Sequence, residues 1–294
     1  MPKKILLVGG TGYLGRHLNS HLIEEESEVF LTGTSNFRQE NYFQINFEDP
    51  LSYSTLIGHY FDLVMVLAAK LNSLSTCDLN HPDLSVNTLG YASFLQYLKD
   101  HQLTAKIIYI SSMTVYSPKN QLPVSENGAI APVNTYGLSK YIGECVTSFF
   151  CNSTHVRGVI LRLPGVYGGD KRGGFIYNTI DNLKNGNPVQ ISSQNLIFWE
   201  TIHVDDLCLM IKNFIRQYEW KQTLDVYNVC YGRETDFYDT FEFIKTNTAN
   251  REAIISETEK GYIPFFLSNE KLKNIIPMRE DYFGKLKEYI SEIE

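Results

Sequence analysis

The chain has 294 residues, 43% of them hydrophobic, and its 26 basic and 33 acidic side chains give a formal net charge of −7. This length suffices for about two domains or one large α/β unit with a substantial core. The acidic balance argues against a surface that wraps nucleic acid or an anionic membrane, although a local basic patch could still bind a phosphate-bearing metabolite. We therefore expect neither a nucleic-acid partner nor a membrane partner.

The amino-terminal residues and the cysteines indicate where the protein resides. Residues 1–8 hold two lysines and then only four apolar residues before a pair of glycines, which is too short a run for a signal peptide. No stretch of the chain approaches the roughly 20 apolar residues of a membrane span. The five cysteines are irregularly spaced and include no C-x-x-C, as expected of reduced and mostly buried thiols. We therefore expect a cytoplasmic protein.

Short β-branched runs alternate with longer amphipathic stretches in the first part of the chain. The runs expected to form buried strands are Ile5–Val8, Val29–Thr32, Leu63–Leu67, Ile107–Ile110 and Val159–Leu161. Helices are expected over Tyr13–Glu25, Leu84–Lys99 and Thr135–Phe150. Alternation of helices with continuously apolar strands predicts an α/β fold, a doubly wound parallel sheet of Rossmann type that is covered on both faces.

The alternation loosens after Leu163. Glycines and charged residues cluster over residues 165–174, which predicts a mobile loop. Further helices are expected around Phe175–Lys184, Asp205–Gln217, Thr235–Lys245 and Asp281–Ile293. We assign residues 1–164 to a dinucleotide-binding domain, with a contribution from about 199–230, and residues 165–198 and 231–294 to a smaller α/β substrate-binding region.

A glycine-rich segment follows the first expected strand and opens the first expected helix. Its glycines at positions 9, 12 and 15 have the spacing G-x-x-G-x-x-G. Gly9 permits a tight turn, Gly12 lets backbone amides approach a pyrophosphate, and Gly15 lets the helix pack closely on the strand. The helix N-terminus adds partial positive charge. The segment therefore predicts a dinucleotide site.

The end of the second expected strand indicates which dinucleotide binds there. An acidic residue at this point would accept hydrogen bonds from the adenosine ribose of NAD, and the chain has none. Gly33 leaves room, Thr34 and Ser35 offer hydroxyls, and Arg38 offers a guanidinium, a set that suits the 2′-phosphate of NADP. The pattern favours NADP, with NAD as the alternative.

Tyr136 and Lys140 begin another expected helix. Their four-residue interval places the phenol and the ammonium on one helical face. A nearby cation favours the phenolate, so we expect the pKa of Tyr136, ordinarily about 10, to be lowered. Ser112 lies 24 residues earlier, at the carboxyl end of an expected strand, where doubly wound sheets bind ligands. Ser112 would polarise a substrate oxygen while Tyr136 handles the proton.

Together, the glycine spacing, Ser111-Ser112-x-x-Val115-Tyr116 and Y-x-x-x-K resemble the extended short-chain dehydrogenases/reductases, in the branch of nucleotide-sugar epimerases, dehydratases and reductases. Four further segments resemble motifs of that family: Leu67-Ala68-Ala69, Asn87-Thr88-Leu89-Gly90, Arg162-Leu163-Pro164-Gly165-Val166-Tyr167-Gly168 and Ile202-His203-Val204-Asp205-Asp206.

The resemblance implies an enzyme whose catalytic residues are Ser112, Tyr136 and Lys140, with Tyr136 and Lys140 also contacting the coenzyme. It implies a pyrophosphate turn formed by Gly9, Thr11, Gly12, Tyr13, Leu14 and Gly15. The other coenzyme-binding residues that we predict are Gly33, Thr34, Ser35, Arg38, Asn46, Phe47, Leu67, Ala68, Ala69, Asn87, Leu163 and Val166. Asn46 stands where relatives carry an acid and can still bond an adenine edge.

Departures from the family pattern narrow the reaction. Sugar 4,6-dehydratases of this family carry an Asp-Glu pair after the catalytic hydroxyl, and combined 3,5-epimerase/4-reductases use a cysteine near that position, whereas this chain has Met113-Thr114. Chemistry at C4 of a nucleotide sugar remains. Our leading hypothesis is NADPH-dependent reduction of a 4-keto sugar. The alternatives are a C4 epimerase that retains NAD and, from another class, a non-catalytic NAD(P)-binding sensor or assembly module.

Contacts with the nucleotide sugar, with a partner subunit and with metals complete the predictions. Candidate substrate-binding residues are Met113, Thr114, Gly165, Lys171, Arg172, Trp199 and Arg233. A homodimer is plausible by resemblance, through a bundle containing the Tyr136–Phe150 helix. We predict no metal site, because His203, Asp205 and Asp206 have no third ligand at suitable spacing.

Overall fold

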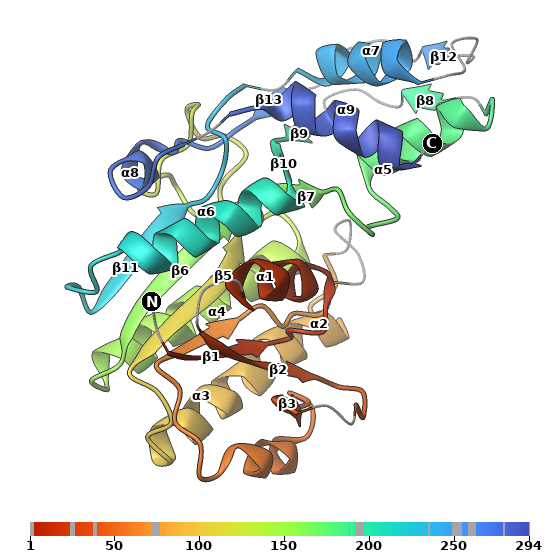
Figure 1. Ribbon diagram of the computed structural model, residues 1–294. Helices are drawn as coiled ribbons and strands as arrows, with labels where there is room; N and C mark the ends of the chain where they lie inside the picture. Colours follow the sequence, from red (N-terminus) through yellow and green to blue (C-terminus); the bar gives the residue numbers. More distant parts are fainter. Residues whose placement is uncertain are drawn as a thin grey trace.

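The protein is described by a computed structural model in which residues 3–23, 27–37, 40–71, 77–187, 189–191, 197–234, 236–248, 255–257, 263–278 and 280–293 are placed. Figure 1 shows a helix-covered sheet and, beyond one end of its strands, a smaller group of helices and short strands. No helix in the placed part of the chain combines the length and apolarity that crossing a bilayer requires.

A parallel sheet forms the larger part of the molecule. Its strands are β1 (Lys4–Val8), β2 (Glu28–Gly33), β3 (Tyr42–Gln44), β4 (Leu63–Val66), β5 (Lys106–Ser112), β6 (Arg157–Leu163) and β11 (Leu224–Asn228). Their order across the sheet is β11-β6-β5-β4-β1-β2-β3, and every neighbouring pair is parallel. The chain leaves β1 toward one edge and then returns to build the other. This reversal confirms the predicted doubly wound sheet.

Helices cover both faces of the sheet because successive strand residues point to opposite sides. In β1, Ile5 and Leu7 join one apolar cluster, whereas Leu6 and Val8 join the other. The first cluster is shared with α1 (Tyr13–Ile23) and α6 (Val204–Gln217), and the second with α3 (Tyr91–Asp100) and α4 (Thr135–Asn152). The continuous apolar pattern of the strands therefore reflects burial on both faces.

The smaller group is built from short elements. Its helices are α5 (Phe175–Lys184), α7 (Phe237–Asn247), α8 (Glu270–Lys273) and α9 (Tyr282–Ile293). Three parallel strand pairs lie among them: β7 (Gly165–Tyr167) with β10 (Thr201–His203), β8 (Val189–Ile191) with β12 (Ile255–Glu257), and β9 (Ile197–Trp199) with β13 (Ile263–Phe265). Because β7 begins two residues after β6 ends, this group starts at the carboxyl end of the sheet.

The expected elements differ from the observed ones at a few places. The expected helix Leu84–Lys99 is divided into α2 (Pro82–Ser85), a single π-helical turn η2 (Val86–Gly90) and α3. At the end of that turn Gly90 lies against the backbone of Phe47, where a side-chain carbon would come within 2.6 Å of the Phe47 carbonyl oxygen. Two short 3-10 helices, η1 (Pro50–Leu56) and η3 (Met113–Val115), were not expected.

Candidate active site

A cavity of about 340 Å³ opens at the carboxyl ends of β1, β2 and β4, where the strand order reverses. Most of the predicted coenzyme-binding residues line it: Gly9, Thr11, Gly12, Tyr13, Leu14, Gly15, Gly33, Thr34, Asn46, Phe47, Leu67, Ala68 and Ala69. The sequence analysis did not single out six other lining residues: Val8, Thr32, Ile45, Glu48, Lys70 and Val86. The cavity therefore gathers residues from five separate segments of the chain.

The glycine turn has no room for a side chain at Gly9 or at Gly15. Gly9 has a φ of +83°, and a side-chain carbon there would lie 2.8 Å from backbone atoms of Ala68. At Gly15 the same carbon would lie 2.6 Å from Gly10. The Gly9 N–H donates to the Thr32 hydroxyl at 3.0 Å. The first three residues of α1 also line the cavity, so a helix N-terminus lies there, and such a terminus suits a pyrophosphate.

Gly33 and Thr34, at the carboxyl end of β2, line the cavity, and the sequence analysis connected this segment with coenzyme choice. Gly33 lies against Thr11, whose hydroxyl would be 2.2 Å from a side-chain carbon at position 33. Thr34 and Ser35 are exposed, and their carbonyl oxygens accept hydrogen bonds from Gln44 and Tyr42. Arg38 lies outside the described residues.

An acidic residue that the sequence analysis did not consider also lines the cavity. The carboxylate of Glu48 lies 2.8 Å from the ammonium of Lys70 in an exposed ion pair. Its position two residues after Asn46 is the signal that would have identified it.

Asn87 stands behind the cavity wall. Its side-chain oxygen accepts from the Lys70 N–H at 2.7 Å, and its amide donates to the Lys70 carbonyl at 2.9 Å and to the Ser139 hydroxyl at 3.0 Å. Both amide hydrogens are thereby used within the protein. The residue ties the wall segment to the helix that carries Tyr136 and Lys140.

The end of β5, which carries Ser112, and the start of α4, which carries Tyr136, are held together by the packing of α4 against η3. Ser112 ends β5, and its hydroxyl oxygen accepts from the Thr114 hydroxyl at 2.9 Å. Gly137 contacts Thr114 so closely that a side-chain carbon there would lie 2.3 Å from the Thr114 carbonyl oxygen. The Asn134 side chain caps α4 by accepting from the Gly137 N–H at 2.7 Å. Ser112 and Tyr136 are both only partly buried.

Lys140 is 2% exposed, and its ammonium lies 4.3 Å from the centre of the Tyr109 ring. Burial lowers the pKa of Lys140 to about 7, although the Glu144 carboxylate raises it. Burial raises the pKa of Tyr136 to about 12, and the Asp83 carboxylate adds to this rise. The expected lowering of the phenol pKa is therefore wrong for this state, because desolvation opposes the phenolate and the lysine lies over Tyr109.

A buried polar network supports this end of the sheet. The Arg162 guanidinium donates to both Glu144 oxygens, at 2.9 and 2.7 Å, and the Ser111 hydroxyl donates to Glu144 at 2.5 Å. Arg162 also donates to the Tyr116 hydroxyl at 2.8 Å, which donates onward to Asn228 at 2.8 Å. The network links α4 to the ends of β5, β6 and β11.

Two predicted coenzyme contacts lie at the end of β6 and in β7. Leu163 is buried at the end of that strand, and Val166 in β7 is partly buried. Neither residue lines the cavity described above. The Val166 carbonyl accepts a hydrogen bond from the Lys171 ammonium at 2.6 Å.

The predicted substrate-binding residues are dispersed. Met113 is 2% exposed within an apolar cluster, which removes its side chain from the surface that a substrate could contact. Thr114 is buried against Ser112, and Trp199 packs on Phe265 with ring centres 4.8 Å apart.

The remaining substrate candidates are held by other parts of the protein. The N–H of Gly165 donates to the Glu200 carbonyl. Arg172 is exposed and donates to the Gly169 carbonyl at 2.8 Å. Arg233 is paired with Glu280 at 3.2 Å. Lys171 lies near a side chain of the cavity wall, with its ammonium 5.7 Å from the centre of the Tyr13 ring.

The His203-Val204-Asp205-Asp206 segment forms the start of α6. His203 is buried and caps the helix by accepting from the Asp205 N–H at 3.3 Å. The Asp206 carboxylate accepts from the Tyr231 hydroxyl at 2.5 Å. Within the described residues, no group of three or more His, Cys, Asp or Glu side chains could hold a metal ion.

Known proteins are similar to this chain over most of its length. A Methanocaldococcus jannaschii protein, provisionally named as a UDP-glucose 4-epimerase, is 28% identical over 88% of this chain and 87% of its own. An Escherichia coli dTDP-4-dehydro-6-deoxyglucose reductase is 22% identical over 85% of this chain and 83% of its own. The crystal structure of a Thermotoga maritima UDP-glucose 4-epimerase with UDP-glucose superposes with a TM-score of 0.84 at 22% identity, covering 99% of this chain and 98% of that one.

The structural similarity confirms the fold. The sequence profile of the NAD dependent epimerase/dehydratase family matches residues 5–230, which span the glycine turn, the tyrosine–lysine pair and β11. The chain therefore belongs to the NAD dependent epimerase/dehydratase family, as its motifs predicted.

Proposed function

We propose that the protein interconverts nucleotide sugars as a C4 epimerase that retains its NAD(H). The observation that carries this proposal is the contact of the start of α4 with the turn that follows β5. Gly137 packs on Thr114, and Thr114 donates to Ser112, so the helix start that carries Tyr136 lies close to the strand end that carries Ser112. Met113 and Thr114, which follow this serine, supply no acid–base pair for expelling water. The site therefore favours hydride and proton transfer at one carbon over dehydration.

The cavity fits a dinucleotide at its glycine turn, and NAD, when bound, would accept and return a hydride. Ser112 would donate a hydrogen bond to the C4 oxygen of the sugar. With a pKa of about 12, the Tyr136 phenol is protonated near neutral pH and can donate its proton to a keto oxygen. The reverse step, removal of a proton from the C4 hydroxyl, needs the phenolate, which the charged form of Lys140 would favour.

Three observations bear on the choice between the epimerase and the reductase. The epimerase is favoured by the relative that is 28% identical over most of the chain, since it is named for that reaction. The reductase with NADPH is favoured by the absence of an acid among Gly33, Thr34 and Ser35, and by a second relative named as a sugar reductase. We place the epimerase first and keep the reductase as the second candidate.

The nucleotide that the purified protein carries tests this order. We expect denaturation to release NAD(H), and we expect UDP-glucose and UDP-galactose to interconvert without added coenzyme. Release of no dinucleotide, together with consumption of one NADPH for each 4-keto sugar reduced, would overturn the epimerase in favour of the reductase.

Replacement of Tyr136 tests whether the site is catalytic at all. In Tyr136→Phe we expect turnover to fall by about 10²- to 10⁴-fold, because the proton relay is lost, while the dinucleotide stays bound. Tyr141→Phe, on the next turn of α4, is the matched control and should retain activity. Equal turnover in Tyr136→Phe and the unaltered protein would contradict the catalytic role of Tyr136, whereas bound dinucleotide without turnover in either protein would favour the non-catalytic binding module.

A further inference from the structure

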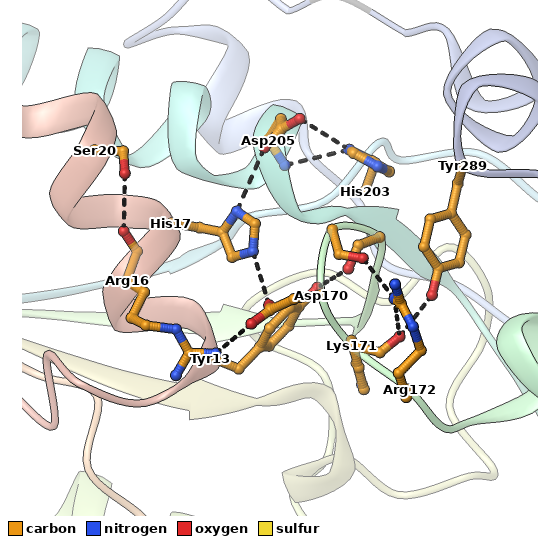
Figure 2. Close-up of polar contacts among 12 residues, drawn as sticks. Tyr13, Arg16, His17, Ser20, Asp170, Lys171, Arg172, His203, Asp205 and Tyr289 are labelled. Carbon is orange, nitrogen blue, oxygen red and sulfur yellow. Dashed lines mark hydrogen bonds and ion pairs between the residues drawn. The ribbon is translucent and has the colours of Figure 1, made fainter. Parts of the chain in front are cut away.

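A single arginine connects the coenzyme turn to the loop that follows β7. The Arg16 guanidinium donates to the Thr11 carbonyl at 2.7 Å. It also donates to the Asp170 carboxylate at 2.5 Å, as Figure 2 shows. Thr11 lines the coenzyme cavity, and Asp170 belongs to residues 168–174, which we call the substrate-side loop. These two segments are more than 150 residues apart in the chain and are joined here through one side chain.

Three side chains of α1 face this loop, as positions 13, 16 and 17 share one side of a helix. The Tyr13 hydroxyl donates to the Gly168 carbonyl at 3.0 Å. The His17 ring lies 3.2 Å from Asp170 through Nε2 and 3.7 Å from Asp205 through Nδ1 (Figure 2). The bonds from Arg16 and then His17 lower the pKa of Asp170, so its carboxylate stays charged.

The backbone of the loop also contacts these rings directly. Gly168 has a φ of +103°, and a side-chain carbon there would lie 2.3 Å from Nε2 of His203. Gly169 has a φ of +55°, and the same carbon would lie 2.4 Å from the His17 ring. Only glycines allow the chain to approach α1 and the start of α6 this closely.

Lys171, which follows Asp170 in the loop, is a predicted substrate-binding residue that lies beside the cavity wall. Lys171 donates to the Val166 carbonyl at 2.6 Å, and its own carbonyl accepts from the Tyr289 hydroxyl at 2.6 Å. Its ammonium lies 5.7 Å from the centre of the Tyr13 ring, and Tyr13 lines the coenzyme cavity. A contact that holds Asp170 in place therefore also restrains Lys171, the next residue of the loop.

We propose that Asp170 is a positioning residue that, through Arg16 and His17, couples occupancy of the coenzyme turn to the order of the substrate-side loop. Coenzyme that holds Thr11 in place also holds Arg16, and Arg16 holds Asp170. By thermodynamic linkage, an ordered loop strengthens coenzyme binding by the same factor. The inference rests on the proposed binding of a dinucleotide at the glycine turn.

Hydrogen exchange with NAD as the probe tests the coupling without any substrate. In the unaltered protein we expect NAD to slow amide exchange both in residues 9–15 and in the substrate-side loop. In Asp170→Asn we expect protection of residues 9–15 to remain and exchange in the loop to be about two- to five-fold faster, the range for an exposed ion pair. High NaCl should shift the unaltered protein toward the variant, because Arg16 and Asp170 are 53% and 55% exposed.

The Lys4–Glu28 pair supplies the matched control. It joins the starts of β1 and β2, away from the coenzyme turn, and is similarly exposed, at 49% and 46%. Glu28→Gln should leave both protections unchanged. Protection of the glycine turn without protection of the loop, or equal loop protection in Asp170→Asn, would overturn the coupling and leave the proposed function standing. Absence of protection in both segments would overturn the two together.

Discussion

At the scale of single residues, Lys140 combines a deep burial with a charge that the proposed chemistry needs. Lys140 is 2% exposed, so its charged form is less stable in the protein than in water, and its pKa accordingly falls to about 7. The ring of Tyr109 and the carboxylate of Glu144 offset part of this cost. The buried charge of Lys140 therefore lowers the free energy of unfolding, although the proposed reaction needs it.

This destabilisation has a definite dependence on pH. The folded-state pKa of Lys140 lies below its value in the unfolded chain, so the cost is full below about pH 7 and disappears as the pH approaches 10.5. We expect Lys140→Met to abolish turnover and, at pH 6, to raise the free energy of unfolding by a few kcal/mol, because each tenfold loss of proton affinity corresponds to about 1.4 kcal/mol. Urea unfolding at pH 6 and pH 9 measures this. A variant that is less stable at pH 6 would contradict it.

Single residues also show which features of the candidate site could be predicted from the sequence. The glycine turn was predictable because its conformation and close approach depend on residue type, and those residues do line one cavity. The pKa of Tyr136 was not, because its direction depends on burial and on Asp83, which is distant in sequence. Lys70 likewise became a candidate only when folding placed it beside Glu48 on the cavity wall.

At the scale of elements, the network around Glu144 holds three elements together. Glu144 on α4 accepts from Arg162 on β6 and from Ser111 on β5, all of them buried. Removing one partner of a buried ion pair leaves the other charge uncompensated. The network therefore fixes the helix that carries Tyr136 and Lys140 relative to the strand that carries Ser112.

We expect Glu144→Gln to lower the free energy of unfolding by about 3–5 kcal/mol, because the Arg162 charge loses its partner. It should also lower the pKa of Lys140 further, since the Glu144 carboxylate raises that pKa, and so move the pH–rate profile to lower pH. Glu270→Gln, which removes an exposed pair with Lys273, is the control and should change stability by less than about 0.5 kcal/mol. Equal stability of the two variants would contradict this account.

Sequence periodicity located most of the elements, and the exceptions have physical causes. The expected bounds of α5 agree with the structure, because its apolar residues repeat at helical spacing. β3 is three residues long and β11 alternates apolar and polar residues, so neither shows the continuous apolar run of a central strand. Their places at the two edges of the sheet explain this pattern.

At the scale of the whole molecule, the helical face opposite α1 and α6 carries exposed apolar side chains. Phe149 on α4 is 74% exposed, and Leu89 in the adjoining π turn is 72% exposed. We propose, in keeping with the resemblance noted above, that this face is covered by a second copy of the chain. Burying such residues in an interface would remove apolar surface from water.

Light scattering coupled to size exclusion tests this arrangement. We expect the unaltered protein to be a dimer and Phe149→Glu to be a monomer, because a buried carboxylate would face the partner. Leu51→Glu is the control, since Leu51 is 83% exposed in η1 and its replacement should leave the dimer intact. A monomeric unaltered protein, or a dimeric Phe149→Glu, would contradict the prediction.

The position of β11 at the edge of the sheet affects how the protein folds during its synthesis. Its pairing partner β6 ends at residue 163, whereas β11 begins at residue 224, so a ribosome releases the first six strands long before the seventh. Throughout that interval β6 presents bare N–H and C=O groups, which invite pairing with other chains. The nascent protein is thus prone to aggregate during this interval, and the risk lasts until β11 is synthesised and pairs with β6.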